Sequence, residues 1–357
     1  MKIKNKQLDF PLIQGGMGIG VSLSSLAGNV MKEGCMGVLS AAHPGYNRND
    51  FYKDSLKANK QALADEVCKA RDLSNGNGLL AVNIMCASKD FEEYARHCST
   101  LNIDALICGA GLPLSLPSMV DNKDILLAPI VSSGKAAELI CKIWNKRYNV
   151  LPDFIVIEGS DAGGHLGFKK DDLLNGTTQS LDDILADVLV VVNKYEIEFN
   201  KNIPVFVAGG IYDGKDMYKY EKLGASGVQM ATRFICTYEC DASNKFKEAV
   251  LNCNEEDIKI VKSPTGFPGR ALNNKFIKEL EIKGNVAISK CLKCLTPCNP
   301  SDTPYCISIA LINSVKGNID KGLLFVGTNA YRIKNMLHVS ELINEIKQKY
   351  VECGGTI

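Results

Sequence analysis

The sequence has almost no net charge and no long hydrophobic run. Its 41 lysine and arginine residues nearly balance 40 aspartate and glutamate residues, which leaves a formal net charge of +1 at pH 7. This balance provides no overall field that would attract nucleic acid or an anionic membrane surface. No stretch reaches the roughly 18 apolar residues that a membrane-spanning helix needs. We therefore expect a small-molecule partner, with no nucleic acid and no membrane.

The sequence also lacks the pattern of a secreted protein. Residues Met1–Lys6 are basic, but no apolar signal region follows them. The 14 cysteines are numerous, yet in a large chain of strand and helix patterns they indicate reduced thiols rather than a disulfide scaffold. A cytoplasmic location is the expectation. The length of 357 residues allows one large domain with an insertion or two ordinary domains.

Short apolar runs bounded by glycine, proline or aspartate recur up to residue 230. They are continuous rather than alternating, which is typical of parallel strands buried on both faces. Most of these runs are separated by segments whose apolar residues have helical spacing. The runs are Pro11–Gln14, Met36–Ser40, Leu79–Met85, Ala105–Cys108, Ile125–Val131, Phe154–Ile157, Val205–Ala208 and Gly227–Met230. Eight such strands joined by helices predict an α/β fold, the TIM (β/α)8 barrel.

The alternation of strand and helix patterns ends near Cys236, and this change suggests three regions. Residues 1–235 are predicted to form the barrel. Residues 236–304 are predicted to form a helical cap insertion with a cysteine cluster beside the barrel mouth. Residues 305–357 are predicted to form C-terminal helices that pack back on the barrel, and the last of them is amphipathic. Its apolar face holds Val339, Leu342, Ile343, Ile346 and Tyr350.

One histidine lies inside a glycine-rich turn directly after the sixth predicted strand. The turn reads Glu158-Gly159-Ser160-Asp161-Ala162-Gly163-Gly164-His165-Leu166-Gly167. Glycines remove side-chain bulk, so the backbone can approach a flat ligand while the imidazole is held against it. Because TIM barrels carry their catalytic residues where strands end, His165 is predicted to be catalytic rather than structural.

The remaining histidines are interpreted as structural. His97 belongs to a charged helical stretch and His338 precedes the last helix. His43, in Ala42-His43-Pro44-Gly45, is the one that could also line the mouth.

Two further glycine turns end the seventh and eighth predicted strands, at Ala208-Gly209-Gly210-Ile211 and Gly227–Thr232. Loops at these positions of a TIM barrel often donate backbone N–H groups to a phosphate. They predict a phosphorylated cofactor or substrate, the alternative being ordinary tight turns. The run Gly15–Gly20 would bring backbone close to a planar ring with Met17 against one face, although a glycine run alone is more often a simple turn.

Four cysteines lie close together in the sequence, at Cys291, Cys294, Cys298 and Cys306. Their spacing could hold zinc or an iron–sulfur cluster. A single C-x-x-C without a second matched pair is a modest signal, and no histidine lies nearby. Reduced structural thiols are the preferred interpretation, and no metal is assigned.

Together these motifs resemble the nitronate monooxygenases, formerly called 2-nitropropane dioxygenases. That family shares an FMN-binding barrel with the flavin-dependent enoyl-acyl-carrier-protein reductase II. The resemblance covers nearly the whole chain, and the Ala-Gly-Gly-His motif is specific to this superfamily. The segments that carry it are Gln14–Gly18, Glu158–Gly167, Ala208–Ile211, Gly227–Phe234 and Ser263–Arg270.

The resemblance implies FMN as the cofactor, with His165 as the catalytic residue. Gly16 and Met17 would lie beside the isoalloxazine ring. Glu158 stands where relatives often have glutamine, and a carboxylate there would repel phosphate unless it faces the ribityl hydroxyls. Ala231 stands where relatives often have glycine. The residues implied to bind FMN are Gly16, Met17, Asn83, Glu158, Gly163, Gly164, Gly209, Gly210, Gln229, Met230, Ala231 and Thr232.

The reaction implied by the resemblance is oxidation of an alkyl nitronate with O2 to a carbonyl compound and nitrite. His165 would serve either as an imidazolium that stabilises the bound anion or as a base that deprotonates a neutral nitroalkane. One alternative is an NAD(P)H-dependent enoyl-ACP reductase that uses the same FMN and histidine. Another is a flavin-binding regulatory or carrier protein without turnover. The resemblance leaves a homodimer open.

Overall fold

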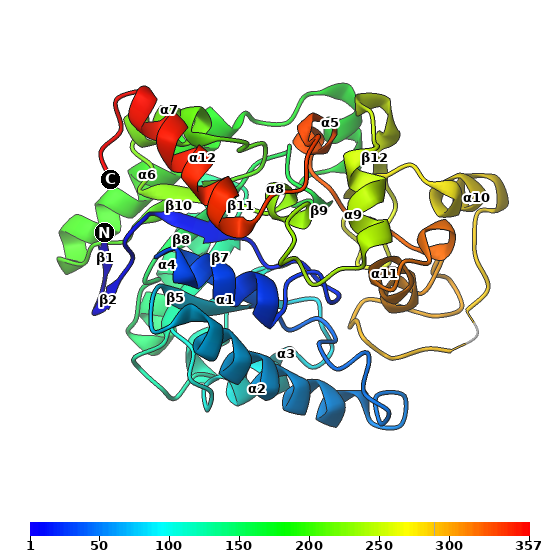
Figure 1. Ribbon diagram of the computed structural model, residues 1–357. Coiled ribbons are helices and arrows are strands. Elements are labelled where there is room, and N and C mark those ends of the chain that lie inside the picture. The colour runs from blue at the N-terminus through cyan, green and yellow to red at the C-terminus, as the bar shows by residue number, and fades with distance from the viewer. Residues whose placement is uncertain (289) are drawn as a thin grey trace.

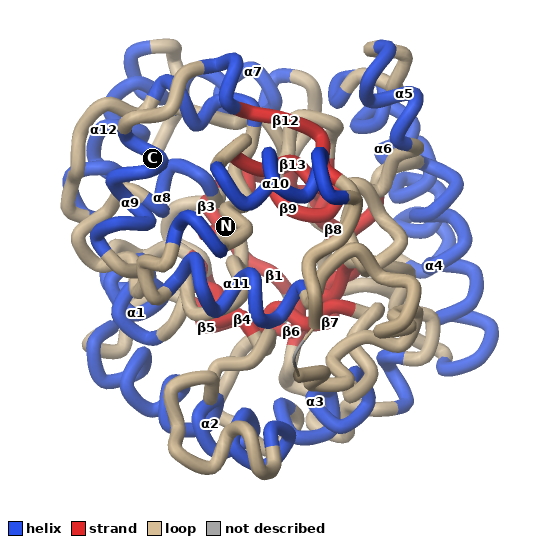
Figure 2. The backbone as a smooth tube through the Cα atoms, turned by 90° about the vertical axis from the view of Figure 1, so that its right-hand side faces the viewer, coloured by secondary structure: helices blue, strands red, loops and turns tan. Residues whose placement is uncertain are grey.

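The computed structural model describes residues 1–288 and 290–357, and eight strands of this described chain close into a parallel barrel. Figure 2 shows the strands at the centre with helices around them. Every predicted apolar run overlaps one barrel strand, so the predicted TIM barrel is confirmed. The barrel strands are β3 (Leu12–Gln14), β4 (Met36–Ser40), β5 (Leu79–Met85), β6 (Ala105–Gly109), β7 (Leu126–Val131), β8 (Ile155–Glu158), β10 (Val205–Ala208) and β11 (Gly227–Met230).

The strands have continuous apolar sequences because both of their faces are buried. Neighbouring residues of one strand belong to different core clusters: Ile13 packs inside the barrel with Phe154 and Phe206, while Leu12 packs outward against the helices. The rings of Phe154 and Phe206 meet edge to face with centroids 5.5 Å apart. The interior is therefore a packed core, and space for a ligand is left only at an end of the barrel.

Helices cover the outside of the barrel, and side-chain caps begin several of them. Asp54 accepts a hydrogen bond from the Lys57 N–H and Ser133 accepts one from the Ala136 N–H, which satisfies donors that a helix start leaves free. The helices that follow barrel strands are α1 (Ser24–Lys32), α2 (Ser55–Ser74), α3 (Phe91–Cys98), α4 (Gly134–Tyr148), α5 (Lys170–Asn175), α6 (Leu181–Phe199), α7 (Gly214–Lys222) and α8 (Thr232–Ile235).

The two ends of the barrel are closed differently. At one end, β1 (Lys2–Ile3) and β2 (Lys6–Gln7) pair, and Ile3 and Leu8 join the core inside the barrel. The elements between residues 244 and 315 lie at the other end, on the right-hand side of Figure 1. They are α9 (Asn244–Leu251), β12 (Ile258–Val261), β13 (Gly269–Leu272), α10 (Lys275–Lys283) and α11 (Ile307–Val315).

The prediction of a purely helical cap is not confirmed. Strands β12 and β13 pair antiparallel, and β13 also pairs with β9 (Gly164–His165), which forms a three-stranded sheet. The two cap strands have four residues each, and β12 is mostly half-exposed, so they lack the long apolar runs that identify barrel strands. The pairing of β13 with β9 joins segments about a hundred residues apart, which local sequence patterns do not report.

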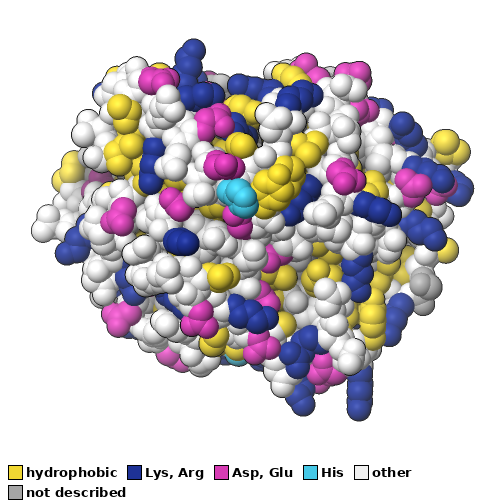
Figure 3. All heavy atoms as spheres, viewed as in Figure 1, with side chains coloured by type: hydrophobic (Ala, Val, Ile, Leu, Met, Phe, Trp, Pro, Cys, Tyr) yellow, Lys and Arg dark blue, Asp and Glu magenta, His cyan; other side chains and the backbone are white. Residues whose placement is uncertain are grey.

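The chain ends in α12 (Val339–Glu352), whose buried face consists of the five residues predicted from its spacing. This helix lies against α7 and α1 on the outside of the barrel. Acidic and basic side chains are intermixed on the face drawn in Figure 3, in keeping with the small net charge. No helix in the described part of the chain is both long and apolar enough to cross a membrane.

Candidate active site

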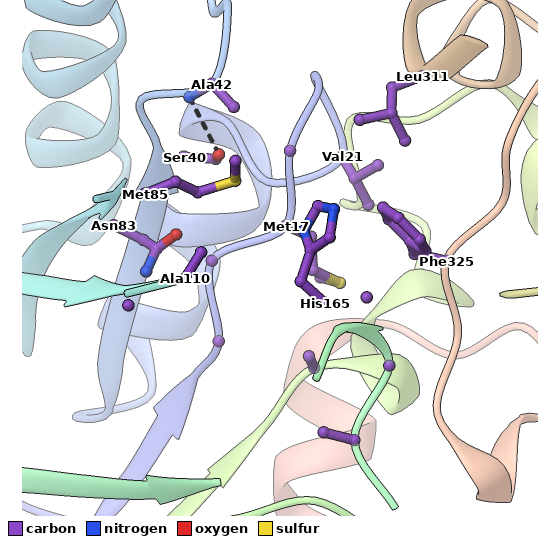
Figure 4. Close-up of a pocket in the computed structure, with 18 of the residues that line it drawn as sticks. Met17, Val21, Ser40, Ala42, Asn83, Met85, Ala110, His165, Leu311 and Phe325 are labelled. Carbon is purple, nitrogen blue, oxygen red and sulfur yellow. Dashed lines mark hydrogen bonds between the residues drawn. The ribbon is translucent and has the colours of Figure 1, made fainter. Parts of the chain in front are cut away.

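A cavity of about 260 Å³ lies at the carboxyl ends of the barrel strands, under the segments that follow the barrel. Its wall contains residues from the ends of all eight barrel strands or from the loops that follow them. Leu311 and Phe325 close it from the other side (Figure 4). Each residue predicted to bind a cofactor, and His165 with them, lines this one cavity. The sequence motifs therefore converge in space, while the role of each residue stays a prediction.

His165 projects into the cavity from β9, with Phe325 beside it in Figure 4. Its backbone is paired with Gly269 of β13. Its Nε2 lies 2.9 Å from Ser263 Oγ, and its ring meets the Phe325 ring edge to face at a centroid distance of 5.0 Å. Burial lowers the pKa of His165 to about 4, so the imidazole is neutral at physiological pH.

The loop that carries His165 is held in shape by later parts of the chain. The Arg270 guanidinium donates hydrogen bonds to the carbonyl oxygens of Ser160 and Ala162, the latter at 2.7 Å. A Cβ atom on Gly163 would lie only 2.4 Å from the backbone of Val326. The position therefore requires glycine. Arg270 was not singled out from the sequence, where only its membership in the Ser263–Arg270 segment gave a signal.

The glycine turns on the other walls also allow close backbone approaches. Gly209 and Gly210 have φ angles of +94° and +84°, a left-handed region that residues with a side chain rarely adopt. A Cβ on Gly16 would lie 2.5 Å from the Cβ of Asn83. These turns expose backbone to the cavity and leave room for a flat group.

Glu158, at the end of β8, also lines the cavity. Burial raises its pKa to about 8, so the side chain is a neutral carboxylic acid at pH 7. In this state it can both donate and accept a hydrogen bond, as a glutamine side chain does. The repulsion expected between a carboxylate and a phosphate therefore does not arise below this pKa.

His43 is a second imidazole in the cavity wall. Its loop follows β4, which stands diametrically opposite β8 in the barrel order. Asn59 Oδ1 accepts a hydrogen bond from the Gly45 N–H at 3.0 Å, so Asn59 Nδ2 is the atom that faces His43 Nδ1, also at 3.0 Å. Because this amide nitrogen can only donate, Nδ1 accepts and Nε2 carries the proton.

The Nε2–H of His43 then donates to Ser308 Oγ, 3.1 Å away. Burial lowers the pKa of His43 to about 4. The sequence favoured a structural role for this residue while allowing that it could line the barrel mouth, and it does line the cavity. His97 and His338 lie outside the cavity: His97 contacts the Lys60 carbonyl and His338 contacts Glu239.

The chain is similar to proteins of one family along almost its whole length. A sequence model of the family described as nitronate monooxygenase matches residues 1–349. A probable nitronate monooxygenase from Staphylococcus aureus strain MSSA476 is 27% identical over 308 residues, covering 76% of this chain and 78% of that protein. Its counterpart from strain JH9 is 28% identical over 310 residues, with the same coverage of 76% and 78%.

Solved structures share the fold. FabK from Thermotoga maritima superposes with a TM-score of 0.73 at 23% identity, covering 97% of this chain and 94% of that one. A nitroalkane oxidase from Streptomyces ansochromogenes superposes with a TM-score of 0.69 at 20% identity, covering 97% of this chain and 96% of that one.

Proposed function

The chain belongs to the nitronate monooxygenase family, and we propose that it is an FMN-dependent oxidoreductase that converts alkyl nitronates and O2 to carbonyl compounds and nitrite. The observation that carries the proposal is the environment of His165. This residue presents a neutral imidazole to a cavity whose other walls are glycine turns at the strand ends.

The residues around the cavity suit FMN. The left-handed glycines Gly209 and Gly210, with Thr232 beyond β11, offer backbone N–H groups of the kind that bind phosphate. The close approach of Gly16 to Asn83, with Met17 beside it, suits a flat ring. When bound, FMN would supply the redox centre that takes electrons from the nitronate.

Glu158 supports the same assignment despite its departure from the glutamine of many relatives. Its protonated side chain offers an O–H donor and a carbonyl acceptor at the end of β8. A neutral acid can hydrogen bond to the ribityl chain or to the phosphate without charge repulsion. We propose that it replaces the glutamine functionally at neutral pH.

His165 would act as a neutral group. Its lowered pKa favours the base that removes a proton from a nitroalkane, or the hydrogen-bond donor to a nitronate oxygen, over a resident imidazolium. A bound anion would raise the pKa of the ring, because a nearby negative charge favours the protonated form. Ser263 orients the imidazole through Nε2.

The purified protein should be yellow, and anaerobic mixing tests the reaction. Rapid bleaching of the flavin by a nitronate, followed in air by O2 uptake and nitrite release, supports the proposal. Bleaching by NADPH or NADH with reduction of an unsaturated thioester would identify the enoyl reductase instead. Folded protein that stays colourless and shows no FMN binding in a titration would contradict both.

A further inference from the structure

A second cavity, of about 320 Å³, lies beside the first and is lined by four thiols. They belong to the cysteine cluster of the sequence, Cys291, Cys294, Cys298 and Cys306. Lys89 and Lys293 line the same cavity. Nothing in the proposed reaction uses these groups.

The turn between the first two cysteines has the form of a ligand turn. Lys293 has a φ angle of +52°, which is unfavourable for a residue with a side chain. Its N–H donates a hydrogen bond to Cys291 Sγ at 3.3 Å. Backbone N–H groups aimed at sulfur stabilise a thiolate, and they are a common way for a protein to support and tune bound iron–sulfur groups.

The cysteine segment is fastened to the barrel. The Lys89 N–H donates to the Cys294 carbonyl at 3.1 Å and the Thr296 N–H donates to the Ala87 carbonyl at 3.0 Å, on either side of a bridge between Ser88 and Leu295. Cys306, the N-cap residue of α11, lines the same cavity. The segment that carries Cys294 is thus fixed by backbone pairing that does not depend on the thiols.

Two kinds of metal centre place different demands on the positions of the thiols. Around one zinc ion every sulfur lies about 2.3 Å from the same point. Among the described residues no three thiol, imidazole or carboxylate groups are placed to hold a single ion. A polynuclear cluster binds each thiolate to a different iron, so its ligands stand farther apart around a larger space.

We propose that Cys291, Cys294, Cys298 and Cys306 bind an iron–sulfur cluster in this second cavity. Each thiol loses its proton to solvent as its sulfur forms a bond to iron. The ammonium groups of Lys89 and Lys293 would offset part of the negative charge that four thiolates bring.

The cluster would stand next to the proposed active site. Cys294, Leu295 and Ile307 line both cavities. Ser308, which accepts a hydrogen bond from His43, also hydrogen bonds to the Cys294 thiol. The position suits a one-electron centre in contact with the wall of the flavin cavity.

Metal analysis of the full chain tests the proposal independently of the flavin chemistry. The protein is purified without oxygen, incubated with equal amounts of ferrous and ferric iron and with sulfide, desalted and assayed for iron, acid-labile sulfide and zinc. We expect about four irons and four sulfides per chain. We also expect a paramagnetic signal after reduction with dithionite.

Cys291→Ser and Cys298→Ser should each lose more than half of the iron and sulfide, whereas Cys353→Ser, outside the cavity, should keep both. Zinc in place of iron, or four titratable thiols with no iron after reconstitution, would overturn the proposal. If the serine variants do not fold, the iron and sulfide content of the unaltered protein still decides. FMN content and nitronate turnover are measured separately, so failure of the proposed reaction would not be mistaken for failure of the cluster.

Discussion

The loops after β4 and β8 each present a histidine to the same cavity from opposite sides, but only one imidazole has hydrogen-bonding capacity left. Burial lowers the pKa of both rings to about 4. Both nitrogens of His43 have partners, Asn59 and Ser308. For His165 the described residues supply a partner only at Nε2, namely Ser263. Burial and pKa do not separate the two imidazoles here, whereas the free ring nitrogen of His165 does.

The two loops are also held differently. The His43 loop is fixed through its own imidazole, because Asn59 of α2 binds both the ring and the Gly45 N–H. The His165 loop is fixed through its backbone, by Arg270 and by pairing with β13. A histidine whose loop is anchored elsewhere is free to handle a substrate.

The largest difference between the loops should appear on replacing each histidine with asparagine. His165→Asn should keep its yellow FMN but lose turnover by roughly 10²–10⁴-fold, the usual size of an acid–base contribution. His43→Asn should lower turnover by less than about tenfold, because this ring is occupied by the protein and not by the substrate. Steady-state O2 uptake with an alkyl nitronate measures both. Equal losses of turnover in the two variants would contradict the proposed difference between the two histidines.

Removing the support behind the His165 loop should have the next largest effect. Arg270→Met leaves the Ser160 and Ala162 carbonyls without their donor. We expect turnover to fall by about 10–100-fold, the range seen when a supporting residue behind a reactive group is lost. Arg96→Met removes an exposed arginine paired only with Glu92 and serves as the control. Unchanged turnover in Arg270→Met would show that the β13 pairing alone positions the loop.

FMN affinity should depend on pH through Glu158. Its raised pKa means that it ionises as the pH passes about 8, which places a negative charge in the proposed FMN site. Affinity should then weaken by up to about tenfold per pH unit above that value. Glu158→Gln should bind FMN with no such dependence between pH 7 and 9. Fluorescence titration of the apoprotein measures this, and a flat profile in the unaltered protein would place Glu158 away from the cofactor.

The smallest effect concerns stability in acid. Because both folded-state pKa values lie near 4, an unfolded chain with ordinary histidines binds extra protons between about pH 6.5 and 4. Stability should therefore fall as the pH drops through this window and should not change from these groups above it. Each single asparagine variant should reduce the fall in Tm between pH 7 and 5 by a few degrees. A reduction in only one of them would mean that the two rings differ in burial after all.

The sequence predicted the barrel better than it predicted the cap. Strands such as Val205–Ala208 are buried on both faces. Their residues are therefore all apolar, and this can be recognised in the sequence. The pairing of His165 with Gly269 cannot be recognised from the residue types, because each partner lies in a short segment and the contact is long-range.

The same reason applies to parts of the site. His165 was found because glycines surround it in the sequence, while the importance of Arg270 and the partners of His43 come from residues far along the chain. FMN itself was implied by family resemblance. The local sequence patterns alone predicted only a phosphorylated ligand.

The pairing of β9 with β13 also has a consequence for synthesis of the chain. All eight barrel strands lie before residue 235, so they leave the ribosome before Ser263 and Gly269 do. A nascent chain can therefore assemble the cylinder before its histidine has a fixed orientation. The orientation of His165 is therefore fixed late in translation, in a step separate from closure of the barrel.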